Sequence, residues 1–203
     1  MATGRWVEPV TLDGATVRLE PLTVDHLEDL ARVAFDGDLW RWVMVQPTDV
    51  DELRQWMAAA LDEASAGAEV PFATIDRASG RAVGSTRFMS IAAEHRRLEI
   101  GWTWLGSAHQ RSGANREAKL LQLTHAFEVL AANRVEFKTD SLNRKGNSGL
   151  VGIGARLEGT FRNHMVMPGG RIRHSNYYSV TREDWPVVRQ LLTGRGQATQ
   201  TGG

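Results

Sequence analysis

The sequence has no cysteine, no net charge and no long hydrophobic run. Without cysteine there is no disulfide framework, no thiolate zinc site and no cysteine nucleophile. Lysine plus arginine and aspartate plus glutamate each number 24, so no bulk field attracts nucleic acid or an anionic membrane. No uncharged stretch approaches the ~20 residues that cross a bilayer, and the first ten residues lack an apolar signal segment. We therefore expect a cytoplasmic protein with neither nucleic acid nor membrane as a partner.

The composition that remains is that of a folded protein. Hydrophobic residues make up 42% and charged residues 24% of the 203 positions, close to globular averages. This length favours one domain over two, and we place that domain at residues 1–192. Residues 193–203 are rich in glycine, threonine and glutamine, which predicts a disordered tail.

Strand-like and helix-like patterns alternate irregularly along the chain. Strands are expected at 10–12 and 15–22 around an Asp13-Gly14 turn, then at 70–76, 81–90, 97–105, 134–140, 157–167 and 172–180. Helices are expected from Thr23 to about 35, and at 52–64, 115–132 and 143–154. Asp49 or Asp51 is the expected N-cap of the helix at 52–64. This order predicts the α+β class, a mixed sheet with helices on its faces. No G-x-G-x-x-G follows a strand, which argues against a dinucleotide fold.

The stretch Leu98–Leu121 joins a strand, a glycine-bearing loop and a helix start, and such a junction favours anion binding. Unpaired N–H groups and the macrodipole at a helix N-terminus both favour phosphate. Gly113 permits close backbone approach, and Arg111 and Arg116 add positive charge. The alternative is an ordinary strand-to-helix loop that uses a glycine for its turn.

This stretch resembles motif A of the GNAT superfamily, usually Q/R-x-x-G-x-G/A, and the whole chain resembles the RimJ/RimL-like branch. The supporting segments are EIGWTWL, EAKLL, RVEFKTD, N-x(10)-GA and GTFRNHMVMPGGRIR, which with the opening strands span roughly Thr16 to Trp185. The resemblance implies a splayed mixed sheet with helices on both faces. It also implies acetyl-CoA, or another acyl-CoA, held between two central parallel strands with its pyrophosphate on the loop.

By this resemblance, one set of residues binds the acyl-CoA. The set is Gly101, Trp102, Thr103, Arg111, Ser112, Gly113, Ala114, Asn115, Arg116 and Asn143. Backbone N–H groups at 101–103, near a β-bulge of the family, could polarise the thioester carbonyl. Asn143 either contacts the pantetheine or caps a helix. The sequence departs from the motif at one position in either alignment. If Gly113 is the first glycine, Asn115 stands where Gly or Ala is usual; if Gly113 is the second, Arg111 stands in place of the first.

Acyl transfer needs a deprotonated amine and a protonated leaving thiolate. Strand alternation places Glu99 opposite an apolar set, Leu98, Ile100, Trp102 and Trp104, and in the resembled family a glutamate on this strand activates the amine through water. The alternative is a partly exposed carboxylate paired with Arg96 or Arg97. Leu150 stands where many members of the resembled family have a tyrosine that acts as general acid. Ser148 or Ser141 is therefore a candidate proton donor, although most such serines cap helices.

Several aromatic and histidine residues are weaker candidates for a substrate pocket or a metal site. Trp40 and Trp42 could line a substrate pocket, although a place in the core is the better expectation. His164 and His174 could meet across a hairpin, but two histidines without a third ligand are a weak zinc signal, so no metal is expected.

The sequence thus predicts an N-acyltransferase that moves an acetyl or other short acyl group from acyl-CoA to a primary amine. The acceptor could be a protein N-terminus or a small amine, and a homodimer remains open. One alternative is a catalytically weak acyl-CoA-binding or sensor module. Nucleotide binding by the same loop is a weaker alternative, because the Lys-Ser/Thr pair of a P-loop is absent from it.

Overall fold

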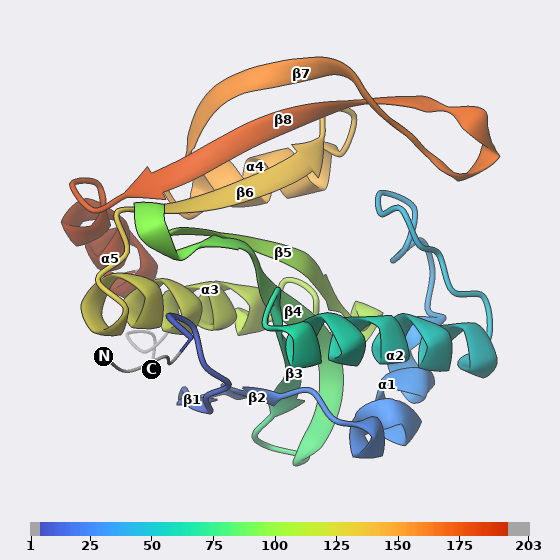
Figure 1. Cartoon of the computed structure of the whole chain (residues 1–203). Coiled ribbons are helices and arrows are strands. Elements are labelled where there is room, and N and C mark those ends of the chain that lie inside the picture. Colours follow the sequence, from blue (N-terminus) through green and yellow to red (C-terminus); the bar gives the residue numbers. More distant parts are fainter. Residues whose placement is uncertain (1–4, 195–203) are drawn as a thin grey trace, which may run out of the picture.

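A computed structural model describes residues 5–194, which form an eight-stranded mixed sheet with helices on both faces (Figure 1). The strands are β1 Leu12–Asp13, β2 Val17–Pro21, β3 Val70–Asp76, β4 Arg81–Ala92, β5 Arg97–Leu105, β6 Arg134–Asp140, β7 Arg156–Val166 and β8 Ile172–Thr181. The α-helices are α1 Leu27–Ala34, α2 Val50–Ala66, α3 Ala114–Thr124, α4 Arg144–Gly152 and α5 Trp185–Gly194. This arrangement confirms the predicted α+β class.

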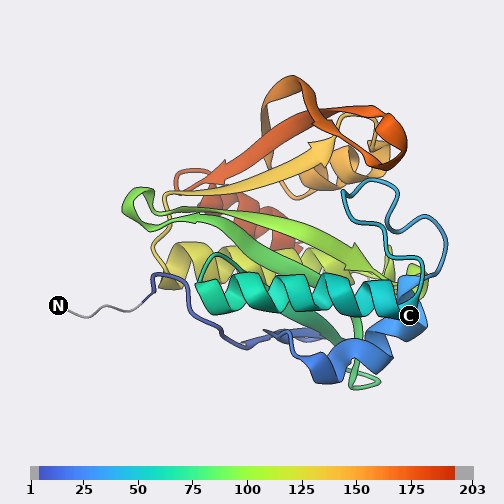
Figure 2. The ribbon, with the colours of Figure 1, turned by 45° about the vertical axis from the view of Figure 1, so that its right-hand side comes forward.

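The sheet order is β1-β2-β3-β4-β5-β6-β8-β7, and only β5 and β6 are parallel neighbours. These two strands pair over three residues alone, Arg97–Glu99 against Arg134–Glu136. Beyond that point β5 stays with β4, and β6 stays with β8, so the sheet divides into two arms (Figure 2). The splayed sheet expected from the resemblance is therefore present.

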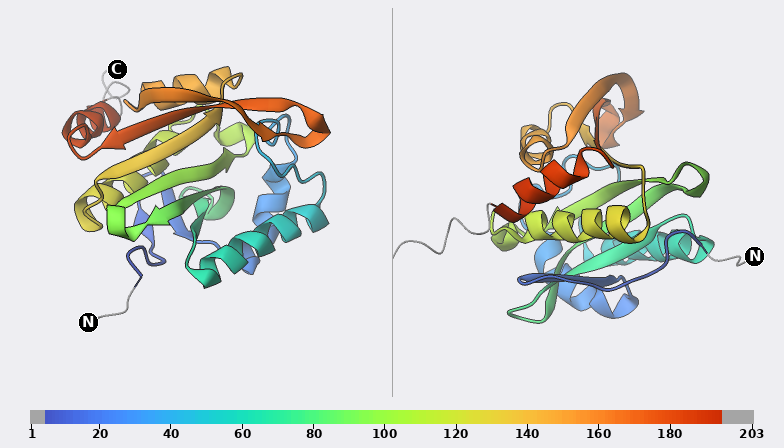
Figure 3. Two further views of the ribbon diagram at one scale, coloured as in Figure 1. Left: turned by 45° about the horizontal axis from the view of Figure 1, so that its top comes forward. Right: turned by 90° about the vertical axis from the view of Figure 1, so that its left-hand side faces the viewer.

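Each face of the sheet has its own apolar core. The larger core lies between the sheet and α3 and α5, which run side by side (Figure 3), and includes Phe88, Leu98, Leu123 and Phe137, each at most 1% exposed. The smaller core lies under α1 and α2. Burial of these side chains, at about 25 cal/mol per Å² of apolar surface, is the main force that holds the helices on the sheet.

The central elements agree with the expected ranges, because apolar periodicity and turn residues agree there. β6 matches its expected range, and Asp49 caps α2 by accepting a hydrogen bond from the N–H of Glu52 at 2.9 Å. The helix expected at 115–132 differs, since α3 ends at Thr124 and a π-helical turn, His125–Val129, follows. No helix in the described range 5–194 has the length and apolarity to cross a membrane.

Helix α5 was not expected from the sequence. Its buried residues Trp185, Val188 and Leu192 have helical spacing, and Pro186 stands in the first turn, where its missing N–H costs nothing. Thr193 and Gly194, assigned to the disordered tail, are the last residues of this helix. The rest of the expected tail lies outside the described residues.

Candidate active site

Glu99 lies at the point where the two arms of the sheet separate. It is the last β5 residue paired with β6, opposite Glu136, and it is only 5% exposed. Its carboxylate is 3.5 Å from the Lys138 Nζ on β6 and accepts a 3.5 Å hydrogen bond from the Ser90 hydroxyl. Burial raises the pKa of Glu99, and the Lys138 ammonium offsets part of that rise. A buried carboxyl with a raised pKa is a typical general base.

The expected surroundings of Glu99 need two corrections. Its charged partner is Lys138, whereas Arg97 pairs with Glu136. Trp102 and Trp104 do not lie opposite Glu99, because the three steps along β5 from Gly101 to Trp104 face only two steps along β4, from Arg87 to Ser85. This bulge, with Trp102 at φ +50°, resets the strand alternation.

The bulge therefore brings the tryptophans onto the face that carries Glu99. Trp104 packs in the core under α1 and α2, and Trp102 packs against that core, while Leu98 and Ile100 face α3. Bulges re-aim side chains and leave a backbone unit out of the regular ladder. The N–H groups of 101–103 thus belong to an irregular segment next to Glu99, as the family resemblance implies.

A cavity of about 740 Å³ lies on this same face, between α2 and the strands. Arg87, which is paired with Gly101 in the sheet, forms part of its wall. The Arg87 guanidinium lies 4.6 Å from the Trp56 ring and 5.0 Å from the Trp102 ring, and 2.8 Å from the Glu69 carboxylate. Glu52, Glu63 and Glu69 also line the cavity, so carboxylates outnumber arginine in its wall.

The loop before α3 has the geometry of an anion site. Gly113 has φ +94°, which a side-chain-bearing residue rarely adopts, and a Cβ built there would meet no atom within 4 Å. The backbone is therefore open to a ligand. Ser112 Oγ donates to the His109 carbonyl at 2.7 Å and accepts from the N–H of Ala114 at 3.3 Å, which shapes the turn. The first-turn N–H groups of α3 have no partner within the helix, so the residues present fit a phosphate.

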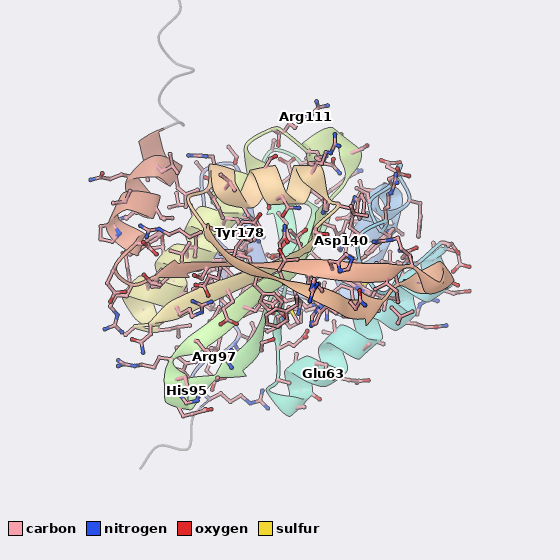
Figure 4. The ribbon with its side chains drawn as sticks, turned by 90° about the horizontal axis from the view of Figure 1, so that it is seen from above. Glu63, His95, Arg97, Arg111, Asp140 and Tyr178 are labelled. Atoms are coloured by element: carbon pink, nitrogen blue, oxygen red, sulfur yellow. The ribbon has the colours of Figure 1, made fainter. Side chains whose placement is uncertain are left out.

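Other residues expected to bind the acyl-CoA have defined positions. Arg111, on the loop, lies at one edge of the molecule, and Glu63, which lines the cavity, lies near the other (Figure 4). Asn115 is exposed. The Arg116 side chain donates to the carbonyls of Leu191 and Leu192 at the end of α5, so its charge is directed away from the loop.

The expected residues of α4 lie on the opposite side of the sheet from Glu99. Asn143 Oδ1 accepts from the Gly146 N–H at 2.9 Å, so this side chain is a helix cap in the structure. Ser148 is exposed. Leu150, in the place of the absent tyrosine, packs against the larger core. The structure does not bring the Ser148 and Glu99 side chains together.

The two tryptophan candidates have different surroundings. Trp40 is 7% exposed in the smaller core, and its indole donates to the Ala34 carbonyl at 2.7 Å, as expected for a core residue. Trp42 is instead partly exposed, and the guanidinium groups of Arg41 and Arg171 lie 5.0 and 5.6 Å from its ring. Among residues 5–194, no group of three His, Asp or Glu side chains could hold a metal ion.

Sequence reasoning missed Lys119, Lys138 and Arg87. Lys119 is buried on the inner side of α3, where its spacing from Ala118 and Leu123 falls within an apolar stripe and was a visible signal. Lys138 lies in a strand, RVEFKTD, whose alternation puts it on the same face as Glu136, directly beside Glu99. Arg87 gave no signal, because its partners come from α2 and from Glu69, distant in sequence.

Comparison with known proteins assigns the family. Residues 16–151 match the model of the acetyltransferase (GNAT) domain, and the chain belongs to this family. A curated relative, the uncharacterized N-acetyltransferase YoaA of Bacillus subtilis (strain 168), is 28% identical over 100 residues, which are 49% of this chain and 55% of that protein. The chain thus matches about half the length of this relative.

Solved structures share the whole fold. A candidate acetyltransferase from T. thermophilus is 35% identical, with a TM-score of 0.85 over 94% of this chain and 98% of that one. Mycobacterium smegmatis RimJ, solved in complex with CoA-disulfide, has a TM-score of 0.80 at 21% identity, over 93% of this chain and 95% of that one. At that identity the likeness concerns the fold alone.

Proposed function

We propose that this protein transfers an acetyl or other short acyl group from acyl-CoA to a primary amine. The observation that carries the proposal is the splitting of β5 and β6 after Glu99, beside an open glycine loop at the start of α3. The two features give a place for a thioester and a place for its phosphates on one strand-loop-helix segment. Family membership and the CoA-disulfide complex of the structurally similar RimJ support the same ligand.

The loop binds the phosphates of the donor in this proposal. N–H groups of Ser112–Arg116, with Gly113 at the closest approach, face the pyrophosphate, and the exposed Arg111 adds charge. When bound, the acyl-CoA supplies an activated thioester carbonyl. The N–H groups of Gly101–Thr103 polarise that carbonyl from the bulge, and the backbone at Asn143 borders the pantetheine.

Glu99 is the proposed general base. Its raised pKa suits it to take a proton from an ammonium group through water at the junction of the two arms. Ser148 is the proposed proton donor to the departing thiolate, acting from α4 on the other side of the sheet. A covalent nucleophile is not needed, which agrees with a chain that has no cysteine.

The cavity beside Trp102 is the proposed acceptor site. Its three carboxylates, against one arginine, favour a positively charged group, and a primary amine is protonated at neutral pH before it reacts. The acceptor is a protein N-terminus or a small amine. We also propose a single domain over residues 1–192 and a cytoplasmic location, where acyl-CoA is available.

The test uses purified protein, acetyl-CoA and a library of peptides and small amines, with free thiol release as the readout. We expect acetyl-CoA, but neither ATP nor NAD, to raise the melting temperature, because a ligand that binds only the folded state stabilises it. We further expect amine-dependent thiol release. Stabilisation without turnover on any amine would favour the acyl-CoA-binding module instead, and stabilisation by NAD alone would overturn the assignment.

A further inference from the structure

We propose that Lys119 is a positioning residue, which holds the β5 bulge in place from the α3 side of the sheet. The inference rests on the proposed function, because the bulge matters as the segment that polarises the thioester. Lys119 touches no part of the acceptor cavity, and its effect on the reaction is exerted through Thr103.

A polar cluster inside the larger core connects Lys119 to the bulge. The Lys119 Nζ donates to the Thr103 Oγ1 at 2.7 Å, to the Gln122 Oε1 at 3.2 Å and to the Thr86 Oγ1 at 3.3 Å. The two threonine hydroxyls are themselves 2.7 Å apart. We call these four side chains the Lys119 cluster.

The cluster spans the irregular part of the sheet. Thr86 stands on β4 between Ser85 and Arg87, where the register shifts, and Thr103 stands across from it on β5, after the positive-φ residue Trp102. An inserted residue leaves the local ladder incomplete, so a bulge needs other contacts to keep one geometry. The Lys119 cluster supplies them by joining both strands to α3.

The same helix begins at the anion-binding loop. Lys119 is five positions after Ala114, the first residue of α3, so one rigid helix connects the phosphate site with the bulge. Through its hydrogen bonds, the Lys119 amine therefore fixes the position of the bulge relative to the phosphate site at the start of α3. An apolar residue of similar length could fill this space in the core but could not bind either hydroxyl.

A lysine in this place is costly, which argues against a role in packing alone. The side chain is 4% exposed, and its three hydrogen-bond partners are uncharged, so burial alone lowers its pKa to about 7. As an ammonium it donates three hydrogen bonds to three oxygens. As a neutral amine it donates two and accepts one from a threonine hydroxyl, so both states are satisfied.

The experiment compares wild type with Lys119→Met and Thr103→Val, with Thr103→Ser as the matched control that keeps the hydroxyl. We expect Lys119→Met and Thr103→Val to lower kcat by about 10- to 100-fold, as small misplacements in active sites do, while the Kd for acetyl-CoA changes little. Thr103→Ser, which restores the hydroxyl, should lose clearly less activity than Thr103→Val. The double variant should be no worse than either single one, since both remove one connection.

A second readout does not depend on turnover. Amide hydrogen exchange at Trp102 and Thr103 should be about 10-fold faster in Lys119→Met, with Leu98 unchanged, because the bulge opens locally. Unchanged exchange at the bulge would overturn the inference, and so would a Lys119→Met variant as active as wild type. If wild type acylates no amine while exchange still responds, the proposed function fails and the positioning contact stands.

Discussion

Removal of the Lys138 ammonium should move the pKa of Glu99 upward. The Nζ lies 3.5 Å from the carboxylate of a residue that is 5% exposed, so water screens the pair poorly. Burial already raises this pKa, the nearby Glu136 carboxylate raises it further, and Lys138 is the main group that lowers it. An opposite charge at such a distance typically changes a carboxyl pKa by about 1–3 units, so Lys138→Met should raise it by at least about one unit.

The assay is the pH dependence of kcat/KM for wild type and Lys138→Met on an amine found by the library screen. A base must be deprotonated to act, so a higher pKa leaves a smaller active fraction at a given acidic pH. The acidic limb of the profile should therefore shift to higher pH by about one unit or more, while activity approaches wild type in alkali.

Arg189→Met is the matched control for the loss of one positive charge. Arg189 lies on α5 and is paired with the partly exposed Glu128 at 3.4 Å, remote from β5. Its removal should leave the acidic limb where it is. Equal shifts in the two variants would show that net charge alone acts, and no shift in Lys138→Met would refute the assignment of Glu99 as the titrating base.

The remaining predictions concern three residues. Glu99→Gln keeps the shape but removes the base, so kcat should fall by about 10²-fold with the acetyl-CoA Kd nearly unchanged, and wild-type activity near neutral pH would refute the role. Gly113→Val should weaken acetyl-CoA binding measured by calorimetry, whereas Gly169→Val, at φ +80° in the β7–β8 turn, should lower only the melting temperature. Lys119→Met should raise the free energy of unfolding most below pH 7 and least near pH 10. The pKa of Lys119 is about 7 in the folded state against 10.5 in the unfolded state, so the cost of burying its charge is lost as the pH rises between these values. A gain in denaturant titrations that is equal at pH 6 and pH 9 would contradict this.

The positions of the strands along the chain could be predicted because local signals agreed with each other. Alternation, turn residues and an N-cap at Asp49 each depend on neighbours only a few positions away, and the strands and α2 follow them. Helix α5 was missed although Trp185, Val188 and Leu192 carry the pattern, since the short stripe follows directly on a strand and a proline stands within it. The π-helical turn at His125 has no local signal that distinguishes it from continued α-helix.

The details of the site could not be predicted, because they depend on a single inserted residue. Alternation gave Trp102 and Trp104 the wrong face. The family resemblance implied a bulge near residues 101–103, but only the register between β4 and β5 shows which side chains it moves. Likewise, Glu99 was recognised as a candidate, but its partner Lys138 comes from another strand that pairs with β5 over only three residues.

The two faces of β5 together favour an enzyme over a binding module. On one face a carboxyl, Glu99, is buried with a raised pKa, and on the other an amine, Lys119, is buried with a lowered one. Each costs stability, and neither lies on the loop that would suffice to bind the phosphates of an acyl-CoA. Ionisable groups with shifted pKa values on both sides of a bulge, where β5 and β6 separate, are instead what proton transfer and carbonyl polarisation require. A module that only bound acyl-CoA would be more stable with apolar residues at both positions.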